Sequence, residues 1–365
     1  MKPIRSLLVS LLVCLAGLGS EAAAQDPNFA PVGPFVFLAD DKVSLKPDGS
    51  YLFQHTDGGL VFEAQIAPDI RIVDNFGRSL EHVLDPERPR VFAYTVFGTF
   101  LTRLRMFNET SNPVRTPSYM PKATIQLAWL KNLSKLKPDD DQFLRGPVEM
   151  WLIDFIPFGH HSNGQNGCLF VQQARIDGEC EPQDPVVIGP EDVNTENGSF
   201  STNYLRLGLE YRRLRPNGDD PEDVRAITRR EWGVGGSIEL NPHGYVGGSI
   251  SETLKPLYGA TRFRITGDIA AGNWRAPIPL LNRVNCGRAW VDGSLMFIQE
   301  AAPVVDDVAV AVEAACLPAR WGGSGLFIRY YQGQDYYNAG FMENIARLQF
   351  GVTFLQAKFL AFPKR

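Results

Sequence analysis

The segment Asn203–Leu214 reads NYLRLGLEYRRL, and its pattern decides the fold. One face of the segment carries leucines and a tyrosine, whereas the other carries arginine, glutamate, glycine and a second tyrosine. Such alternation is typical of a β-strand that has two different faces. A soluble β-sandwich alternates in the same way, so alternation alone does not distinguish a soluble sandwich from a membrane barrel. The repeated charges suit the narrow polar interior of a membrane barrel, whose apolar faces point to lipid.

The same texture extends in both directions from this segment. Lys122–Leu130 and Gly259–Ile269 alternate in the same way, and from about residue 90 onward strand-like segments are separated by turn-forming residues. Residues 25–86 differ, because they are rich in Pro, Asp and Gly and hold only short strand-like pieces such as Tyr51–Phe53 and Leu60–Phe62. We therefore interpret 25–86 as an N-terminal extension of uncertain role and 87–365 as the barrel.

The first residues have the pattern of a secretory signal. Lys2 and Arg5 precede an apolar run from Leu7 to Leu18, and three alanines end at Ala24. This pattern predicts a signal peptide over residues 1–24 that is cleaved near Ala24. The apolar run is too short and wrongly flanked for a stable membrane span. An exported chain that crosses lipid without such a helix needs a closed barrel.

Cysteines and charge narrow the class of protein further. Four cysteines follow the signal, and an even number in an exported chain indicates disulfides. The simplest of the three possible connectivities is sequential: Cys168 with Cys180, and Cys286 with Cys316. The net charge of −5 argues against a nucleic-acid partner. His55, His82 and His243 are isolated and do not have the spacing of metal ligands, so we expect no zinc site.

The stretch Gly159–Gln165, which reads GHHSNGQ, holds the candidate chemistry. If the apolar strand that precedes it continues, His160 and Ser162 share one face and lie within reach of a hydrogen bond. A serine needs a base to become a nucleophile, and histidine suits that role near neutral pH. Asn203, near the start of the strand after the intervening loop, is a candidate for orienting the imidazole.

Two simpler interpretations apply to this stretch. A His-x-Ser pair at a strand end, taken alone, is more often a polar loop than a catalytic pair. His161 points to the opposite face from His160, so we expect a structural role for it.

The residues around this stretch resemble a known family. His160–Gly164 is similar to the His-x-Ser-Asn-Gly signature of outer-membrane phospholipase A, and Ser199–Asn203 fits that family's Ser-x-Ser-x-Asn pattern. Ser111–Arg115, with Tyr119 and Pro121 downstream, resembles its Ser-x-Pro-x-Arg segment. Tyr330–Asn338 and Arg347–Phe354 resemble its last hairpin. The four matches lie in the family's order and together cover about residues 90–355.

The resemblance implies a transmembrane antiparallel β-barrel of about twelve strands in the bacterial outer membrane. It implies calcium-dependent hydrolysis of acyl esters of membrane glycerophospholipids, a phospholipase A1/A2-type activity, with Ser162, His160 and Asn203 on the outer wall near the outer leaflet. The Gly164 amide would serve the oxyanion. Calcium would be held by the Ser199 hydroxyl, the Gln165 carbonyl and Ser111 of the partner in a homodimer.

This chain departs from the family pattern at several places. The loop between Gln165 and Ser199 is much longer and contains two cysteines, so Glu196 or Asp192 is an alternative calcium ligand. The chain ends in Lys364–Arg365 rather than in an aromatic residue. A lipid A deacylase, with Glu191 or Glu196 as third member, remains an alternative function. An inactive barrel that acts as a pore or scaffold is a further alternative.

Overall fold

The computed structural model describes the barrel and the segments near its ends. The described residues are 50–55, 60–67, 69–75, 79, 82–83, 89–107, 114–133, 135–136, 143–144, 147–177, 179–181, 189, 192–194, 196–215, 230–242, 254–275, 285–301, 305–318, 321 and 324–354. The expected signal peptide and Ser111 lie outside them. Among the described residues, no helix is long and apolar enough to cross a membrane.

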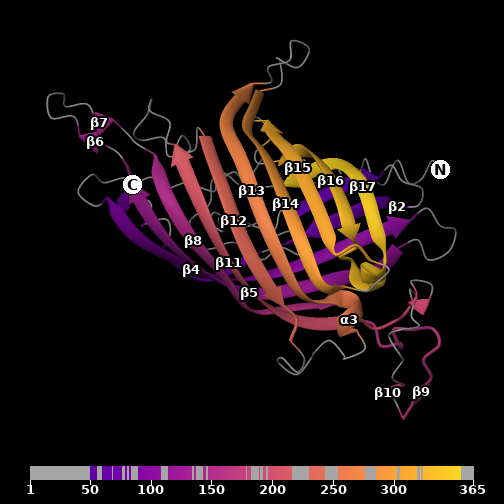
Figure 1. Ribbon diagram of the computed structural model, residues 1–365. Helices are drawn as coiled ribbons and strands as arrows, with labels where there is room; N and C mark the ends of the chain where they lie inside the picture. The colour runs from indigo at the N-terminus through magenta and orange to yellow at the C-terminus, as the bar shows by residue number, and fades with distance from the viewer. Residues whose placement is uncertain are drawn as a thin grey trace.

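Long antiparallel strands curl into one sheet (Figure 1). The strands of the sheet are β1 (Ser50–His55), β2 (Leu60–Ile66), β3 (Asp69–Asp74), β4 (Arg90–Phe107), β5 (Val114–Asn132), β8 (Val148–Ser162), β11 (Ser201–Arg215), β12 (Arg230–Leu240), β13 (Gly259–Arg275), β14 (Asn285–Ala301), β15 (Val308–Pro318), β16 (Ser324–Gln334) and β17 (Asn344–Phe354). The short elements are β6 (Lys135–Leu136), β7 (Phe143–Leu144), β9 (Arg175–Ile176), β10 (Glu179–Cys180), helix α3 (Lys255–Tyr258) and the 3-10 helix η6 (Asn338–Met342).

The sheet closes on itself through its N-terminal strands. β1 pairs with β17, and β2 pairs with both β1 and β4. β3 continues along β4 beyond the end of β2, so the closed ring contains twelve of the sheet's thirteen strands. Twelve antiparallel strands agree with the predicted barrel.

Strands that precede residue 87 take part in the pairing of the barrel sheet. Residues 50–74, which we assigned to an extension outside the barrel, supply the strands that join its first and last edges. The strand-like pieces at Tyr51–Phe53 and Leu60–Phe62 lie in β1 and β2. The sequence did not predict this role because two short strands among Pro, Asp and Gly residues give only a weak alternating signal.

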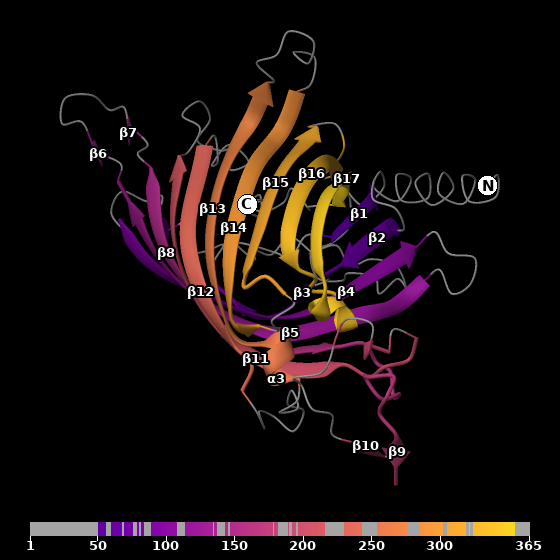
Figure 2. The same cartoon turned by 45° about the vertical axis from the view of Figure 1, so that its right-hand side comes forward.

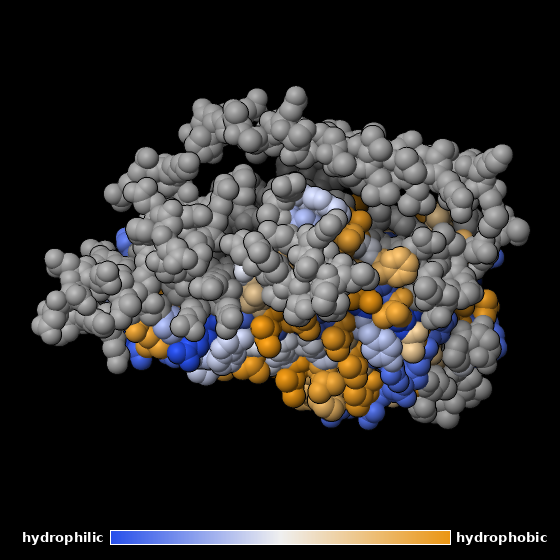
Figure 3. Space-filling view, turned by 90° about the horizontal axis from the view of Figure 1, so that it is seen from above, coloured by the Kyte–Doolittle hydropathy of each residue, from blue (hydrophilic) through white to orange (hydrophobic). Residues whose placement is uncertain are grey.

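The polarity of the wall is the reverse of that in a soluble barrel. Apolar side chains that point outward from the central strands are exposed by about two fifths to two thirds, among them Leu209, Ile265 and Ile269. Their strand neighbours Glu210 and Arg262 point inward and are buried. Figure 3 shows hydrophobic residues gathered on the outer surface of the wall. An apolar exterior around a charged interior is the pattern of a transmembrane barrel, so the structure confirms the predicted fold class.

Charges inside the barrel occur in pairs. Arg105 contacts Glu63 and Asp335, and Arg262 lies 3.1 Å from Glu239. Buried charges are tolerated when they are paired, because the partner offsets the loss of hydration. Other charged residues, among them the paired Arg212 and Asp268, line a cavity of about 520 Å³ between the central strands.

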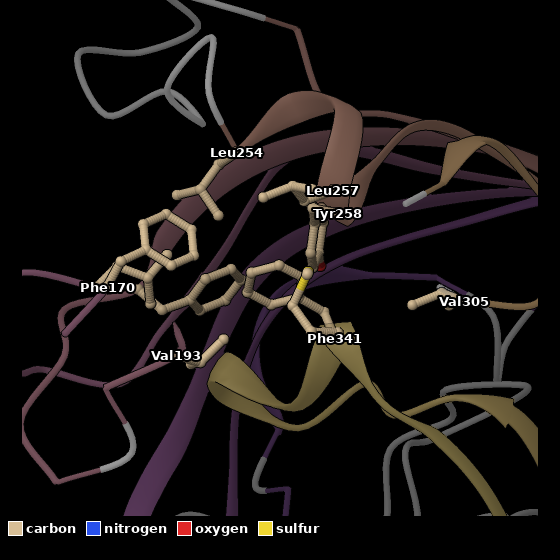
Figure 4. Close-up of a cluster of buried hydrophobic side chains, with 10 residues drawn as sticks. Phe170, Val193, Leu254, Leu257, Tyr258, Val305 and Phe341 are labelled. Carbon is tan, nitrogen blue, oxygen red and sulfur yellow. The ribbon is translucent and has the colours of Figure 1, made fainter. Parts of the chain in front are cut away.

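A hydrophobic cluster lies at one end of the barrel, the end that holds α3 and η6 (Figure 2). Phe170 and Val193 from the segment between β8 and β11 meet Leu257 and Tyr258 of α3 and Phe341 of η6 (Figure 4). β9 and β10 lie at this end too, whereas β6 and β7 lie at the other (Figure 1). We call the end with α3 the capped end.

Both predicted disulfides are present. Cys168 and Cys180 are joined at an S–S distance of 2.05 Å and close a short loop beyond β8 at the capped end. Cys286 and Cys316 join the neighbouring strands β14 and β15, so this bond links the wall itself rather than closing a surface loop.

Candidate active site

A bulge in β8 decides which residues face outward at the end of this strand. Between Ile156 and Gly159 the strand advances three residues while β11 advances two, and the pairing with β5 shifts at the same place. Pro157 lies in this extra step, where a missing backbone donor is tolerated. One added residue exchanges the two faces of the strand that follows it.

The burial pattern follows this exchange. Before the bulge the even-numbered residues Met150, Leu152 and Ile156 are buried at 2% exposure or less. After the bulge an odd-numbered residue, His161, is fully buried. His160 and Ser162 therefore lie on the outward, lipid-facing side, where both are partly exposed.

The outward face brings His160 together with Asn203. The two residues are direct partners in the register of β8 and β11. His160 Nδ1 lies 2.6 Å from Asn203 Oδ1, within hydrogen-bonding distance for an N–H that donates to the amide oxygen. This contact leaves Nε2 as the ring nitrogen that accepts a proton. The amide oxygen fixes the ring without adding a second charge.

Ser162 shares the outward face of β8 with His160, two residues further along. It pairs in register with Ser201 of β11 on one side and with Tyr119 of β5 on the other. The described contacts include no hydrogen bond between Ser162 and His160. Catalytic hydrogen bonds are often long in free enzymes, and the shared face keeps the two side chains adjacent.

A second serine–histidine pair lies on the inner face of the same strand. Ser118 Oγ is 2.5 Å from His161 Nε2, and the Tyr258 hydroxyl is 3.3 Å from Nδ1. The His161 ring stacks on Tyr336 at a centroid distance of 5.2 Å. Ser118 and His161 have no exposed surface, so an ester has no route to this pair. His161 thus points away from His160, as its position in the sequence predicted.

The residues after Ser162 form a tight turn. Gly164 is exposed and has a φ of +67°, a conformation in which a side chain is strained. Asn163 before it is 5% exposed, and its side-chain oxygen accepts from the backbone N–H of Gln165 at 3.3 Å and of Phe200 at 3.0 Å. Sequence reasoning matched Asn163 to a motif but gave it no role. Its longest-range contacts lie 37 residues away, beyond any local pattern.

Two of the three expected calcium ligands lie on facing segments. The chain after Gln165 runs beside the chain before β11, and Ser199 N donates to the Gly167 carbonyl at 2.8 Å. Ser199 is partly buried. A serine hydroxyl and a backbone carbonyl are oxygen donors of the kind that calcium accepts. The third expected ligand, Ser111, lies outside the described residues.

The carboxylates near these segments are less suited to a metal. Both oxygens of Asp192 already accept hydrogen bonds, from Gln172 Nε2 and from Gly189 N, each at 2.8 Å. Glu196 is exposed. Among the residues that the structure describes, no three His, Cys, Asp or Glu side chains cluster where they could hold a metal ion. The described ligand candidates at Gln165 and Ser199 are thus uncharged oxygens.

An aromatic belt marks the opposite end of the wall. Phe92, Trp129, Trp151, Tyr211 and Trp232 come from five neighbouring strands, and the centroids of three pairs of their rings lie 5.0–5.3 Å apart. Such belts sit at membrane interfaces. Trp151 and Ser162 are separated along β8 by about the 9–11 residues with which a tilted strand crosses the hydrocarbon. Ser162 therefore lies near the other interface, at the capped end.

Comparison with known proteins gives structural similarity only. No protein-family model matches the chain, and no curated protein does. Outer membrane phospholipase A from Escherichia coli is 12% identical, with a TM-score of 0.42 over 85% of this chain and 94% of that one. The calcium-bound phospholipase dimer of Salmonella typhi is 13% identical, with a TM-score of 0.37 over 85% and 92%. A Rhodopseudomonas blastica porin mutant is 8% identical, with a TM-score of 0.24 over 84% and 98%.

These TM-scores are too low to establish a shared family. The barrel assignment rests instead on the strand pairing and on the apolar exterior of the wall.

Proposed function

We propose that this chain hydrolyses acyl esters of membrane glycerophospholipids, with Ser162 as nucleophile, His160 as base and Asn203 as the group that orients the base. The observation that carries the proposal is the 2.6 Å contact of His160 Nδ1 with Asn203 Oδ1 on the outer wall, beside Ser162 on the same face. A histidine and an amide held at this distance, next to a serine and facing lipid, have the roles that acyl transfer requires.

The reaction follows from these positions. His160 Nε2 takes the proton of the Ser162 hydroxyl as the oxygen attacks the ester carbonyl, and Asn203 holds the charged imidazolium in place. The tetrahedral intermediate collapses when His160 returns this proton to the leaving alcohol of the lysophospholipid. Water then attacks the acyl-serine, with His160 again accepting and returning a proton. The products are a fatty acid and a lysophospholipid.

The turn after Ser162 would stabilise the oxyanion. Gly164 lies two residues after Ser162 in an exposed turn, and its backbone N–H would donate to the negative oxygen. Calcium bound by the Gln165 carbonyl and the Ser199 hydroxyl would add positive charge beside that oxygen. The resemblance of Ser111–Arg115 to the family's segment extends the proposal to a homodimer in which Ser111 of the partner completes this site.

The position in the wall supports a lipid substrate. A site on the lipid-facing side near one interface meets acyl esters at the depth at which glycerophospholipids carry them. The longest connection of the chain, between β8 and β11, lies at the same end, and long connections are typical of the extracellular side of such barrels. We place the protein in the bacterial outer membrane with Ser162 near the outer leaflet, after cleavage of residues 1–24.

The two alternatives have weaker support. A lipid A deacylase would need a carboxylate on His160 Nδ1, but Asn203 occupies this position, Glu196 is exposed, and Glu191 lies outside the described residues. An inactive pore has no use for the contact of His160 with Asn203.

Labelling with a fluorophosphonate tests the proposal directly. The purified, detergent-folded barrel should hydrolyse phospholipid, and the probe should label Ser162. Ser162→Ala should lose both label and activity while it keeps the heat-modifiable band of a folded barrel. Ser118→Ala is the matched control, because it removes the serine of the buried pair and should leave labelling intact. Labelling that persists in Ser162→Ala would contradict the assignment.

A further inference from the structure

The buried amide of Asn163 joins the two segments that flank the proposed site. Its Nδ2 donates to the Gly198 carbonyl at 2.6 Å, and its Oδ1 accepts from the N–H groups of Gln165 and Phe200. Its own backbone N–H donates to the Phe200 carbonyl at 3.1 Å. One residue thus makes four hydrogen bonds, three of them to the chain just before β11.

The groups on either side of Asn163 are the ones that the proposed reaction needs. Gly164 and Gln165 follow Asn163, and Ser199 lies between its two distant partners Gly198 and Phe200. The amide therefore fixes the oxyanion donor relative to Ser162 and fixes the Gln165 carbonyl relative to the Ser199 hydroxyl. Without it, the two segments are still joined by backbone hydrogen bonds at Gly167, but the turn at Gly164 and Gln165 loses its side-chain link to the chain before β11.

We propose that Asn163 is a positioning residue that sets the geometry of the oxyanion turn and of the Gln165–Ser199 gap; this inference rests on the proposed hydrolase function. A displacement of about 1 Å in such groups costs about a hundredfold in rate. Asparagine suits the position because one side chain supplies both an acceptor for two N–H groups and a donor for a carbonyl.

Two substitutions distinguish the role of the amide oxygen, which accepts hydrogen bonds, from that of the amide nitrogen, which donates one. Asn163→Asp keeps an oxygen that accepts from Gln165 and Phe200 but loses the donor to Gly198, so it should retain part of the function. Asn163→Ala loses both. A residue with a merely structural role would lower the folded fraction in both variants and leave the chemistry of each folded barrel unchanged.

The test compares these variants with a matched buried amide at the other end of the barrel. Asn132 is 7% exposed, and its Nδ2 donates to the Val83 carbonyl at 2.8 Å, far from Ser162 along the wall. We measure the rate of fluorophosphonate labelling of Ser162 in chelator, kcat and KM per labelled site, and the calcium concentration for half-maximal cross-linking of the dimer. Labelling in chelator needs no bound metal, so it reports the turn alone.

Asn163→Ala should slow labelling and lower kcat by about tenfold to a hundredfold and raise the calcium midpoint, while KM changes little. Asn163→Asp should recover part of the labelling rate, and Asn132→Ala should move none of the three values. Equal values for Asn163→Ala and Asn132→Ala, with labelling still dependent on Ser162, would overturn the positioning role alone. A failure of Ser162 to label in the parent chain even at saturating calcium would overturn the hydrolase proposal itself.

Discussion

His160 and His161 are adjacent in β8, but they differ in exposure and in the residues that they contact. His160 lies on the outer wall, partly exposed, with Asn203 2.6 Å from its Nδ1. His161 lies inside the barrel with no exposed surface, between Ser118, Tyr258 and Tyr336. Each histidine has an oxygen near its Nδ1 and a serine on the same face of the wall. The comparison teaches that access to substrate, rather than the serine–histidine pairing itself, distinguishes a candidate active site from a structural contact.

The bulge at Pro157 makes this difference. With regular alternation from Met150 onward, His160 and Ser162 would point into the barrel and His161 would point to lipid. The one extra residue reverses the faces and shifts the register, and β8 pairs with β5 and β11 on both sides of this shift. Bulges are common beside active sites for this reason.

The largest effect is expected when each of the two histidines is replaced by alanine in turn. His160→Ala should lower kcat by about 10³-fold or more, since it removes the base. His161→Ala should keep most of its activity per folded barrel, although the loss of a buried ring lowers stability. The measurement is phospholipid hydrolysis normalised to the heat-modifiable band. An active His160 variant beside an inactive His161 variant would reverse the comparison.

A smaller effect is expected from Asn203→Ala. The side chain orients a neutral imidazole and transfers no proton, so its loss should lower kcat by about tenfold to a hundredfold. KM should change little, because Asn203 does not bind the lipid. Steady-state kinetics with a short-chain phospholipid separate the two constants. A loss as complete as that of His160→Ala would assign Asn203 a larger role than orientation.

Calcium should act on the outer face alone. Ser199→Ala should raise the calcium needed for half-maximal activity by about threefold to tenfold, because one of a few uncharged ligands is lost. Chelation should lower activity and the dimer fraction together, since coupling between two binding events is reciprocal. A calcium titration of activity, run beside cross-linking, checks both. Full activity of a monomer in excess chelator would remove calcium and the dimer from the proposal.

The parts of the site that sequence predicts are those encoded locally. Alternation in Asn203–Leu214 gave the strand and its faces, and the spacing of His160 and Ser162 gave their common side. Asn203 was a candidate from its place near the start of the next strand, and the motif resemblance supported that choice although 43 residues separate it from His160. The bulge at Pro157 was not predicted, although its effect on the outward direction of His160 is decisive.

Other features depend on contacts between distant segments. The cluster at the capped end combines residues from four separate connections between strands, and these connections are irregular in the sequence. The closing strands β1 and β2 pair with β17 and β4, which lie at opposite ends of the barrel sequence. Neither arrangement leaves a periodic signal in one window of residues, so only the folded chain reveals them.

The smallest effect is expected from Tyr258→Phe, which does to His161 what Asn203→Ala does to His160. Each change removes the oxygen that lies near Nδ1 of a histidine. Burial raises the pKa of Tyr258, so its hydroxyl keeps its proton and is available to His161 at 3.3 Å. Phenylalanine keeps the ring contacts with Phe200 and Phe341, and Arg262 still donates to the backbone carbonyl.

The Tyr258 hydroxyl also has hydrogen bonds with the Tyr336 and Arg262 side chains, so Tyr258→Phe should cost about 1 kcal/mol of unfolding free energy for each hydrogen bond that is lost. Urea unfolding in lipid vesicles measures this cost, and kcat measured in the same vesicles should equal that of the parent chain. The paired variants then separate the two faces of β8: the same kind of deletion changes the rate on one face and the stability on the other. A fall in kcat for Tyr258→Phe at unchanged stability would mean that the inner pair takes part in the chemistry, because packing alone does not alter a rate without altering the folded state.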